Sequence, residues 1–212
     1  MRKFNFHNRE IRLTNGTHIK YGQYKIPCCK SCNEDLSREY EIPISNFFKK
    51  PYREALKYLD NPEFVTLLFK WLSLLFIKTH LKDTSLLLNK DLRKNEGTIG
   101  ENYFWDEMHH IHCICRSHYT KAKIDEIAIG TFMFLPAIEV DEPFDYIDSH
   151  SGKTVLIRID DKCLIANLTD ALAGKLLFSG TLNKINAPLS PFQLKEIVAH
   201  LNFINHCWCV KN

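Results

Sequence analysis

The sequence predicts an α+β fold in which a small cysteine-bearing module is followed by a helical region, an antiparallel sheet and a C-terminal helix. Between Tyr52 and about Leu88, apolar residues recur every three or four positions, which is the period of a helix with a buried face. Beyond residue 124 they fall instead into short strand-like runs. We therefore expect two units, a partial module over residues 1–50 and an α+β domain over residues 51–212, with helices at 52–118, strands at 124–185 and a last helix at 190–207.

The first 50 residues hold a hairpin signal and a cysteine-rich turn. Short apolar runs flank Asn15-Gly16, two residues that tolerate the positive φ of a tight hairpin turn. Three cysteines follow in the turn at 26–33. Residues 36–48 should be irregular or briefly helical, with breaks at Pro43 and Pro51.

The helix that starts after Asp60-Asn61-Pro62 is apolar around most of its circumference, so we expect it at the centre of the core. It should pack on strands within 154–168 and on the last helix. Six residues should be buried in this packing: Leu68, Phe69, Trp71, Leu72, Leu75 and Phe76. A polar loop at 90–100 and a further helix at 101–118 should follow.

Turn and cap residues indicate the sheet and the closing helix. Residues 127–138 are rich in strand-forming types, and the runs 154–159 and 163–168 flank Asp160-Asp161-Lys162, as in an antiparallel hairpin. Ser190, Pro191 and Gln193 match an N-cap, a first helical position and the third residue of a capping box. A helix should therefore run from here to about His206.

The composition is that of an ordinary globular protein. Hydrophobic residues make up 45% and charged residues 25%, which excludes long disorder and fibrous repeats. A net charge of +3 permits nucleic-acid binding but does not argue for it. The start lacks the apolar core of a signal peptide, and the longest apolar stretch, 64–77, is shorter than the roughly 20 residues that a bilayer requires. We expect a cytoplasmic protein with no membrane partner and with reduced cysteines.

Two groups of residues have the chemistry of metal ligands. Cys29 and Cys32 supply half of a tetrahedral zinc site, although a plain turn with reduced thiols is the alternative. On a helix, His109 would lie near Cys113 and Cys115 near His118, so either pair could share a metal ion. The alternative for that run is a solvated helix face.

Basic residues alternate with aromatic rings at 20–30 and at 47–53. Cations that hold phosphates beside rings that stack on bases are typical of nucleic-acid binding, whereas a solvated face with ordinary surface tyrosines has a similar composition. The expected nucleic-acid contacts are Lys20, Lys25, Lys30, Lys49 and Lys50. No Walker loop, dinucleotide fingerprint or serine elbow is present.

Two neighbouring patterns are distinctive: Asn15-Gly16-Thr17-x-Ile19-x-Tyr21, and Ile26-Pro27-Cys28-Cys29-Lys30-Ser31-Cys32-Asn33 with Leu36-Ser37 behind it. Together they resemble the middle of a family of bacterial HNH-endonuclease-like proteins. The resemblance implies a ββα module that holds one catalytic divalent ion, Mg²⁺ or another, and hydrolyses phosphodiester bonds of DNA. It also implies that Cys29 and Cys32 are structural zinc ligands and that Asn33 matches the family's helix-entry His or Asn.

Half of the family's pattern has no counterpart. The first Cys-x-x-Cys and the acidic-His pair of the catalytic hairpin are missing, so the zinc site is incomplete and the general base is absent. His7 and His18 have no adjacent acidic residue, and His7 could substitute only by folding back along the hairpin. We therefore expect an HNH endonuclease-like protein that is catalytically impaired but retains affinity for nucleic acid. The alternative is a non-enzymatic α+β scaffold that binds nucleic acid or protein and keeps a vestigial thiol turn.

Overall fold

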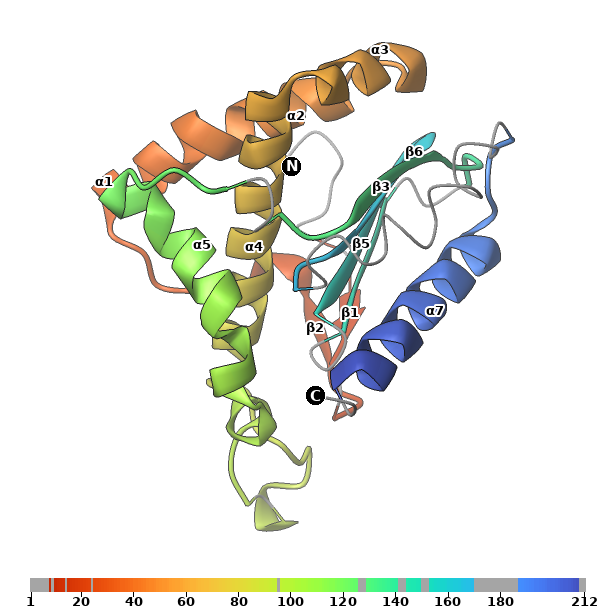
Figure 1. The fold of residues 1–212 in the computed structure, drawn as a ribbon. Helices are drawn as coiled ribbons and strands as arrows, with labels where there is room; N and C mark the ends of the chain where they lie inside the picture. The colour runs from red at the N-terminus through yellow and green to blue at the C-terminus, as the bar shows by residue number, and fades with distance from the viewer. Residues whose placement is uncertain are drawn as a thin grey trace.

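The computed structural model describes residues 8, 10–13, 15–23, 25–94, 96–125, 129–140, 144–149, 153–169 and 187–209. Its layers confirm the predicted α+β class. A bundle of helices covers one face of a four-stranded sheet, and the C-terminal helix covers the other face (Figure 1).

The predicted N-terminal hairpin is confirmed. Strands β1 (Glu10–Arg12) and β2 (His18–Lys20) pair antiparallel and lead into a 3-10 turn, η3 (Tyr21–Gln23). Gly16 has φ 77° in the connecting turn, and Asn15 Oδ1 accepts a hydrogen bond from the backbone N–H of Thr17 at 2.9 Å. The turn residues therefore act as the sequence indicates.

Residues 36–48, expected to be irregular or briefly helical, are helical throughout. Helix α1 (Lys30–Leu36) passes through a π-helical turn, η4 (Ser37–Glu41), into α2 (Ile42–Phe48), and then come α3 (Tyr52–Leu56) and η5 (Lys57–Asp60). The expected break at Pro43 is wrong. The N–H of Ile42 donates to Ser37 O, five residues earlier, so the wider turn absorbs the proline just inside α2.

The long central helix is α4 (Pro62–Asp83). Asn61 is its N-cap, with Oδ1 accepting from the N–H of Glu63 at 2.9 Å, and Pro62 fills the first helical position. In the described part of the chain, α4 is long and apolar enough to span a membrane by length and composition, a test that the core helices of soluble proteins also pass.

The helix expected at 101–118 begins eight residues late. Three 3-10 turns come first, η6 (Leu92–Lys94), η7 (Ile99–Asn102) and η8 (Trp105–Met108), and α5 follows at His109–Thr120. The backbone of Tyr103 is extended, with φ −87° and ψ 138°, and this interrupts the helical path.

The sheet is antiparallel throughout, in the order β3 (Phe132–Pro136), β6 (Lys162–Asn167), β5 (Thr154–Ile159) and β4 (Phe144–Ser149). The β5–β6 hairpin is confirmed, although Lys162 opens β6 and only Asp160 and Asp161 form the turn. The end of the strand region expected at 124–185 lies outside the described residues.

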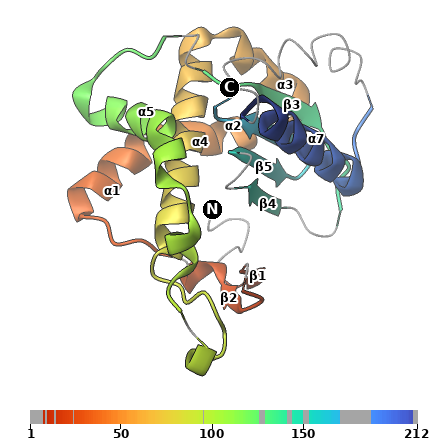
Figure 2. The ribbon, with the colours of Figure 1, turned by 60° about the horizontal axis from the view of Figure 1, so that its bottom comes forward.

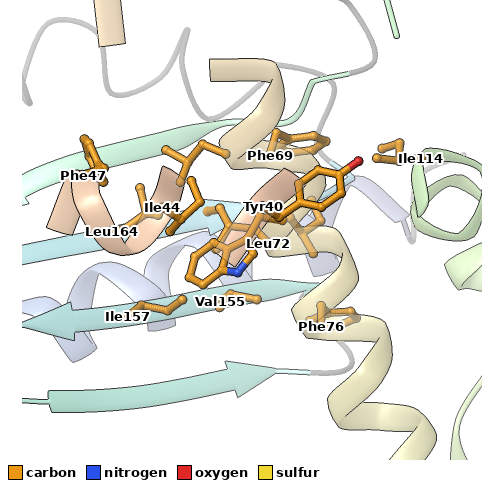
Figure 3. Packing of buried hydrophobic residues seen from close by; sticks show 14 of the residues in the cluster. Tyr40, Ile44, Phe47, Phe69, Leu72, Phe76, Ile114, Val155, Ile157 and Leu164 are labelled. Carbon is orange, nitrogen blue, oxygen red and sulfur yellow. The ribbon is translucent and has the colours of Figure 1, made fainter. Parts of the chain in front are cut away.

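The main core lies between the helical layer and the sheet (Figure 3). Five of the six α4 residues predicted to be buried are buried, and Leu75 is half-buried. Leu72 and Phe69 share this core with Tyr40 and Ile44 from the first 50 residues and with Val155 from the sheet. The core is therefore continuous across residue 50, where the sequence suggested a boundary.

Helix α7 (Pro191–Cys209) has the predicted cap: the N–H of Ser190 donates to Gln193 Oε1 at 2.9 Å, and the N–H of Gln193 donates to Ser190 Oγ at 3.3 Å. The predicted contact between α4 and this helix is wrong, because the sheet lies between them (Figure 1). Side chains alternate along a strand, so Val155 and Ile157 face α4 while Leu156 packs with residues of α7.

Candidate functional site

The two cysteines of the thiol turn open helix α1. Cys29 is the N-cap, and its Sγ accepts a hydrogen bond from the N–H of Cys32 at 3.2 Å. Their Cα atoms are 5.3 Å apart, and the two sulfurs form a disulfide. The expectation of reduced thiols is therefore wrong for this pair. Neither sulfur is a thiolate in this form, so zinc binding stays a prediction for the reduced protein.

The structure does not bring the parts of the expected HNH module together. Asn33 is exposed on α1. The hairpin instead lies beside the loop that follows α4, where Asn15 Nδ2 donates to Leu87 O at 2.6 Å. In two views α1, the helix that contains Asn33, lies away from the β1–β2 hairpin (Figures 1 and 2). His7, the expected substitute base, lies outside the described residues.

His18 has an acidic partner that sequence adjacency did not reveal. Its Nδ1 lies 3.5 Å from Glu10 Oε2, and both side chains are more than half exposed. Glu10 pairs with Lys20 and Arg12 with His18, so Glu10 and His18 are diagonal neighbours across the hairpin. The hairpin register, rather than neighbouring positions in the sequence, was the signal that could have found this pair.

The five lysines expected to contact nucleic acid lie on three separate parts of the molecule. Lys20 belongs to β2, Lys25 and Lys30 lie just before and at the start of α1, and Lys49 and Lys50 follow α2 (Figure 1). They therefore do not form one continuous surface.

The rings expected to stack beside the second group of lysines are core residues. Phe47 and Phe48 are buried. Tyr52 stacks on Phe134 with ring centroids 5.1 Å apart and donates its hydroxyl hydrogen to Phe134 O at 3.2 Å. These rings are therefore not available to stack on bases.

The His/Cys run of α5 divides between two environments. On the exposed face, Cys113 Sγ lies 3.5 Å from His109 Nε2, as helical spacing predicts. Cys115 is buried, and burial raises the pKa of its thiol to about 12, so it is not a thiolate. Among the residues that the structure describes, no group of three or more His, Cys, Asp or Glu side chains is placed to hold a metal ion.

A groove of about 410 Å³ opens between η4, the first half of α4 and the end of α5. We call it the π-turn groove. Its walls carry mostly polar and charged side chains, chiefly Glu39, Tyr40, Glu63, Thr66, Lys70, His118, Lys121 and Lys123.

His118 is the centre of the polar contacts in this groove. It is buried, and its Nδ1 lies 3.1 Å from Glu39 Oε2 and 3.2 Å from the hydroxyl of Tyr40. Lys121 Nζ lies 3.7 Å from the same Glu39 oxygen. Figure 3 shows the ring of Tyr40 within the core and its hydroxyl directed toward Ile114 of α5. Within the described residues, Nε2 of His118 makes no hydrogen bond.

Two irregular backbone features build the walls. The π-helical turn supplies Glu39 and Tyr40, and π turns are frequent at functional sites. Lys121 ends α5 with φ 55°, in the left-handed region, which a C-terminal helix cap often occupies.

Positive charge in the groove is only partly compensated. Lys70 makes no salt bridge in the described part of the chain. Burial lowers the pKa of its ammonium and the nearby Lys121 lowers it further, while Glu39 acts in the opposite direction. Burial, followed by the charge of Glu39, raises the pKa of Tyr40 to about 12, so its hydroxyl stays protonated.

A second polar cluster ties the end of α4 to strand β4. Tyr146 donates its hydroxyl hydrogen to Asp148 Oδ2 at 2.9 Å, and Thr79 Oγ1 lies 3.3 Å from the same hydroxyl. Tyr103 donates to Asp83 Oδ2. Burial is the main cause that raises the pKa of Asp148; Asp83 also raises it, while His80 and the Tyr146 hydrogen bond oppose it.

Sequence reasoning missed most of the π-turn groove, because its members come from three helical segments far apart in the chain. Only His118 had been singled out, as one end of the His/Cys run. Comparisons of the chain with protein-family models, with curated proteins and with solved structures found no match. The resemblance to HNH-endonuclease-like proteins therefore rests on the sequence patterns alone.

Proposed function

We propose that this chain is an HNH endonuclease-like protein that binds nucleic acid, taken here as DNA, but does not hydrolyse it efficiently on its own. The supporting observation is a group of four basic residues that we call the basic corner, on the segment from the end of α2 through α3 to the start of η5: Lys49, Lys50, Arg53 and Lys57. These four cations have no salt bridge in the described part of the chain. Unpaired cations that neutralise phosphates release counterions, which is the main source of affinity without sequence preference.

The same corner carries one exposed ring. Tyr58 lies in η5 and is 40% exposed, and its ring also makes T-shaped contacts with Phe47 and Phe64. An exposed ring beside cations can stack on an unpaired base. We therefore assign base stacking to Tyr58, instead of to the rings of Phe47, Phe48 and Tyr52.

Catalytic impairment is supported by how the expected parts are arranged. Hydrolysis of a phosphodiester needs a base to take the proton of water and a metal ion, such as Mg²⁺, to hold the developing charge. Asn33 offers one neutral amide oxygen, and its helix α1 lies away from the hairpin. The Glu10–His18 pair is the one acidic-His pair of the described hairpin, and it sits on the hairpin rather than beside α1.

The binding proposal is tested by the salt dependence of affinity for a short labelled DNA duplex. Each lost phosphate contact should reduce the slope of log K against log salt by about 0.9. The double variant Lys49→Gln/Arg53→Gln should therefore bind more weakly, with a slope smaller by about 1.8. The matched control is Lys90→Gln/Lys195→Gln, which removes two exposed cations from other parts of the surface. Equal slopes for the two double variants would refute the basic corner.

The impairment is tested by nicking of supercoiled plasmid DNA in Mg²⁺ or Mn²⁺. Loss of a general base typically removes about 10²–10⁴-fold in rate, so we expect no robust cleavage. Nicking that survives purification and disappears in His7→Ala would overturn this expectation, because it would identify a working base. His18→Ala is the companion variant, since it tests the pair that the hairpin forms with Glu10.

The alternative is a non-enzymatic scaffold for a protein partner. It is favoured by two strongly exposed apolar residues in the segment after α4, Leu92 and Phe104. Large apolar side chains at the surface are typical of protein interfaces. Absence of any DNA binding by the wild-type chain would make this alternative the better one.

A further inference from the structure

We propose that the π-turn groove is a binding site for a phosphate monoester, held between the ammonium groups of Lys70 and Lys121. This site is separate from the basic corner, and the inference does not depend on the proposed function. Pockets for small molecules have volumes of about 300–1,000 Å³, and the groove lies near the lower end of that range. We therefore expect a small phosphorylated molecule or a terminal phosphate group in this groove, rather than a length of polynucleotide backbone.

The charged side chains that line the groove do not balance. Lys70, Lys121 and Lys123 line the groove, against the carboxylates of Glu39 and Glu63. Glu39 is already engaged by His118 at 3.1 Å and by Lys121 at 3.7 Å. The ammonium of Lys70 has no carboxylate at salt-bridge distance in the described part of the chain. An anion between the two lysines would supply the missing counter-charge.

The ammonium groups of Lys70 and Lys121 repel each other. The charge of Lys121 disfavours the charged form of Lys70, in addition to the effect of burial. Such a like-charge pair costs free energy when the groove is empty and is relieved when an anion bridges it. Phosphate suits this role because one phosphate group has several acceptor oxygens and can bind both ammonium groups at once.

The groove also offers a hydrogen-bonding group besides its lysines. His118 uses Nδ1 for Glu39 and Tyr40, and its Nε2 makes no hydrogen bond within the described residues. A carboxylate oxygen can only accept a hydrogen bond, so Nδ1 carries the hydrogen that it donates to Glu39, and this contact fixes the ring orientation from one side. Nε2 is left for the ligand: in the neutral ring it can accept a hydrogen bond from a phosphate hydroxyl, and in the protonated ring it can donate one to a phosphate oxygen.

The experiment is calorimetric titration of the full chain with inorganic phosphate and with adenosine 5′-monophosphate. Wild-type protein should bind at least the monoester saturably. Loss of one charged hydrogen bond typically costs a factor of about ten or more, so Lys70→Gln should weaken binding about tenfold. Lys121→Asn should weaken it similarly, and asparagine is chosen because it tolerates the left-handed backbone of this position.

The matched control is Lys78→Gln, which removes a lysine two turns further along α4 and outside the groove. It should bind like the wild type, and circular dichroism should show all three variants folded. No saturable binding of either probe by the wild type would overturn the proposal. So would an equal loss of affinity in Lys78→Gln.

Two sources of a phosphate monoester can be separated with oligonucleotides. If the natural ligand is the 5′-phosphate end of a nucleic acid, a 5′-phosphorylated single strand should bind more tightly than its 5′-hydroxyl counterpart, and Lys70→Gln should abolish the difference. If it is a free nucleotide, the monophosphate should bind and the two strands should not differ. If the salt-dependence test of the basic corner fails, these phosphate-binding results still stand, because Lys49 and Arg53 lie outside the groove.

Discussion

Leu72 gives the sharpest test of the core. It is 1% exposed, and it lies between the helical layer and the sheet, close to Tyr40 and Val155 (Figure 3). Leu72→Ala removes three carbon atoms, which at about 0.8 kcal/mol per buried methylene lowers the free energy of unfolding by about 2.4 kcal/mol. Packing on both sides hinders collapse of the resulting cavity, so we expect a total loss of about 3–4 kcal/mol, within the usual range for such changes.

The assay is urea unfolding followed by far-UV circular dichroism, with Leu81→Ala as the matched control. Leu81 belongs to the same helix but is 45% exposed, so its truncation should cost much less. The reasoning would be refuted if the two variants unfolded at the same urea concentration with unchanged slopes. That result would mean that α4 is not the central element of the core.

Two further predictions concern the thiol turn and the buried carboxylate. After reduction, chelator-free protein should hold zinc weakly and substoichiometrically, because two thiolates leave two coordination positions open. Elemental analysis giving one tightly held zinc per chain would contradict this. The double variant Cys29→Ser/Cys32→Ser should abolish zinc binding, whereas Cys113→Ser should not. The raised pKa of Asp148 means that the folded protein gives up this proton at a higher pH than the unfolded chain, so its ionisation lowers stability as pH rises through that pKa. Asp148→Asn should therefore be more stable than wild type at neutral pH, and should gain no stability below the ordinary pKa of aspartate, about 4. Urea unfolding across this pH range measures the difference, with a change at an exposed aspartate, Asp106→Asn, as the control. An Asp148→Asn variant less stable than wild type at neutral pH would refute the prediction.

Features encoded by neighbouring residues were predicted well. The cap at Ser190 and Gln193 and the turn at Asn15-Gly16 depend on hydrogen bonds and backbone angles within four residues, so the sequence states them directly. The burial of Leu72 and Phe69 followed from helical periodicity, which requires no knowledge of the partner surface.

Features decided by distant contacts were predicted poorly. Phe47 and Tyr52 have the composition of a nucleic-acid surface, and only their packing with Phe64 and Phe134 shows that they belong to the core. Likewise, the apolar face of α7 could have met α4, because nothing local specifies which face of the sheet each helix covers. The π-turn groove depends on three helical segments at once, so no window of the sequence contains its pattern.

Pro43 connects the wrongly expected helix break with the π-turn groove. A proline has no N–H to donate to the carbonyl four residues earlier, which here belongs to Glu39, and this is why a break was expected. The chain instead widens into a π turn just before it, with Ile42 donating to Ser37. In a regular helix, adjacent side chains point about 100° apart, yet Glu39 and Tyr40 both reach Nδ1 of His118, at 3.1 Å and 3.2 Å. The irregular turn that accommodates the proline is therefore also the turn that presents two consecutive side chains to one histidine.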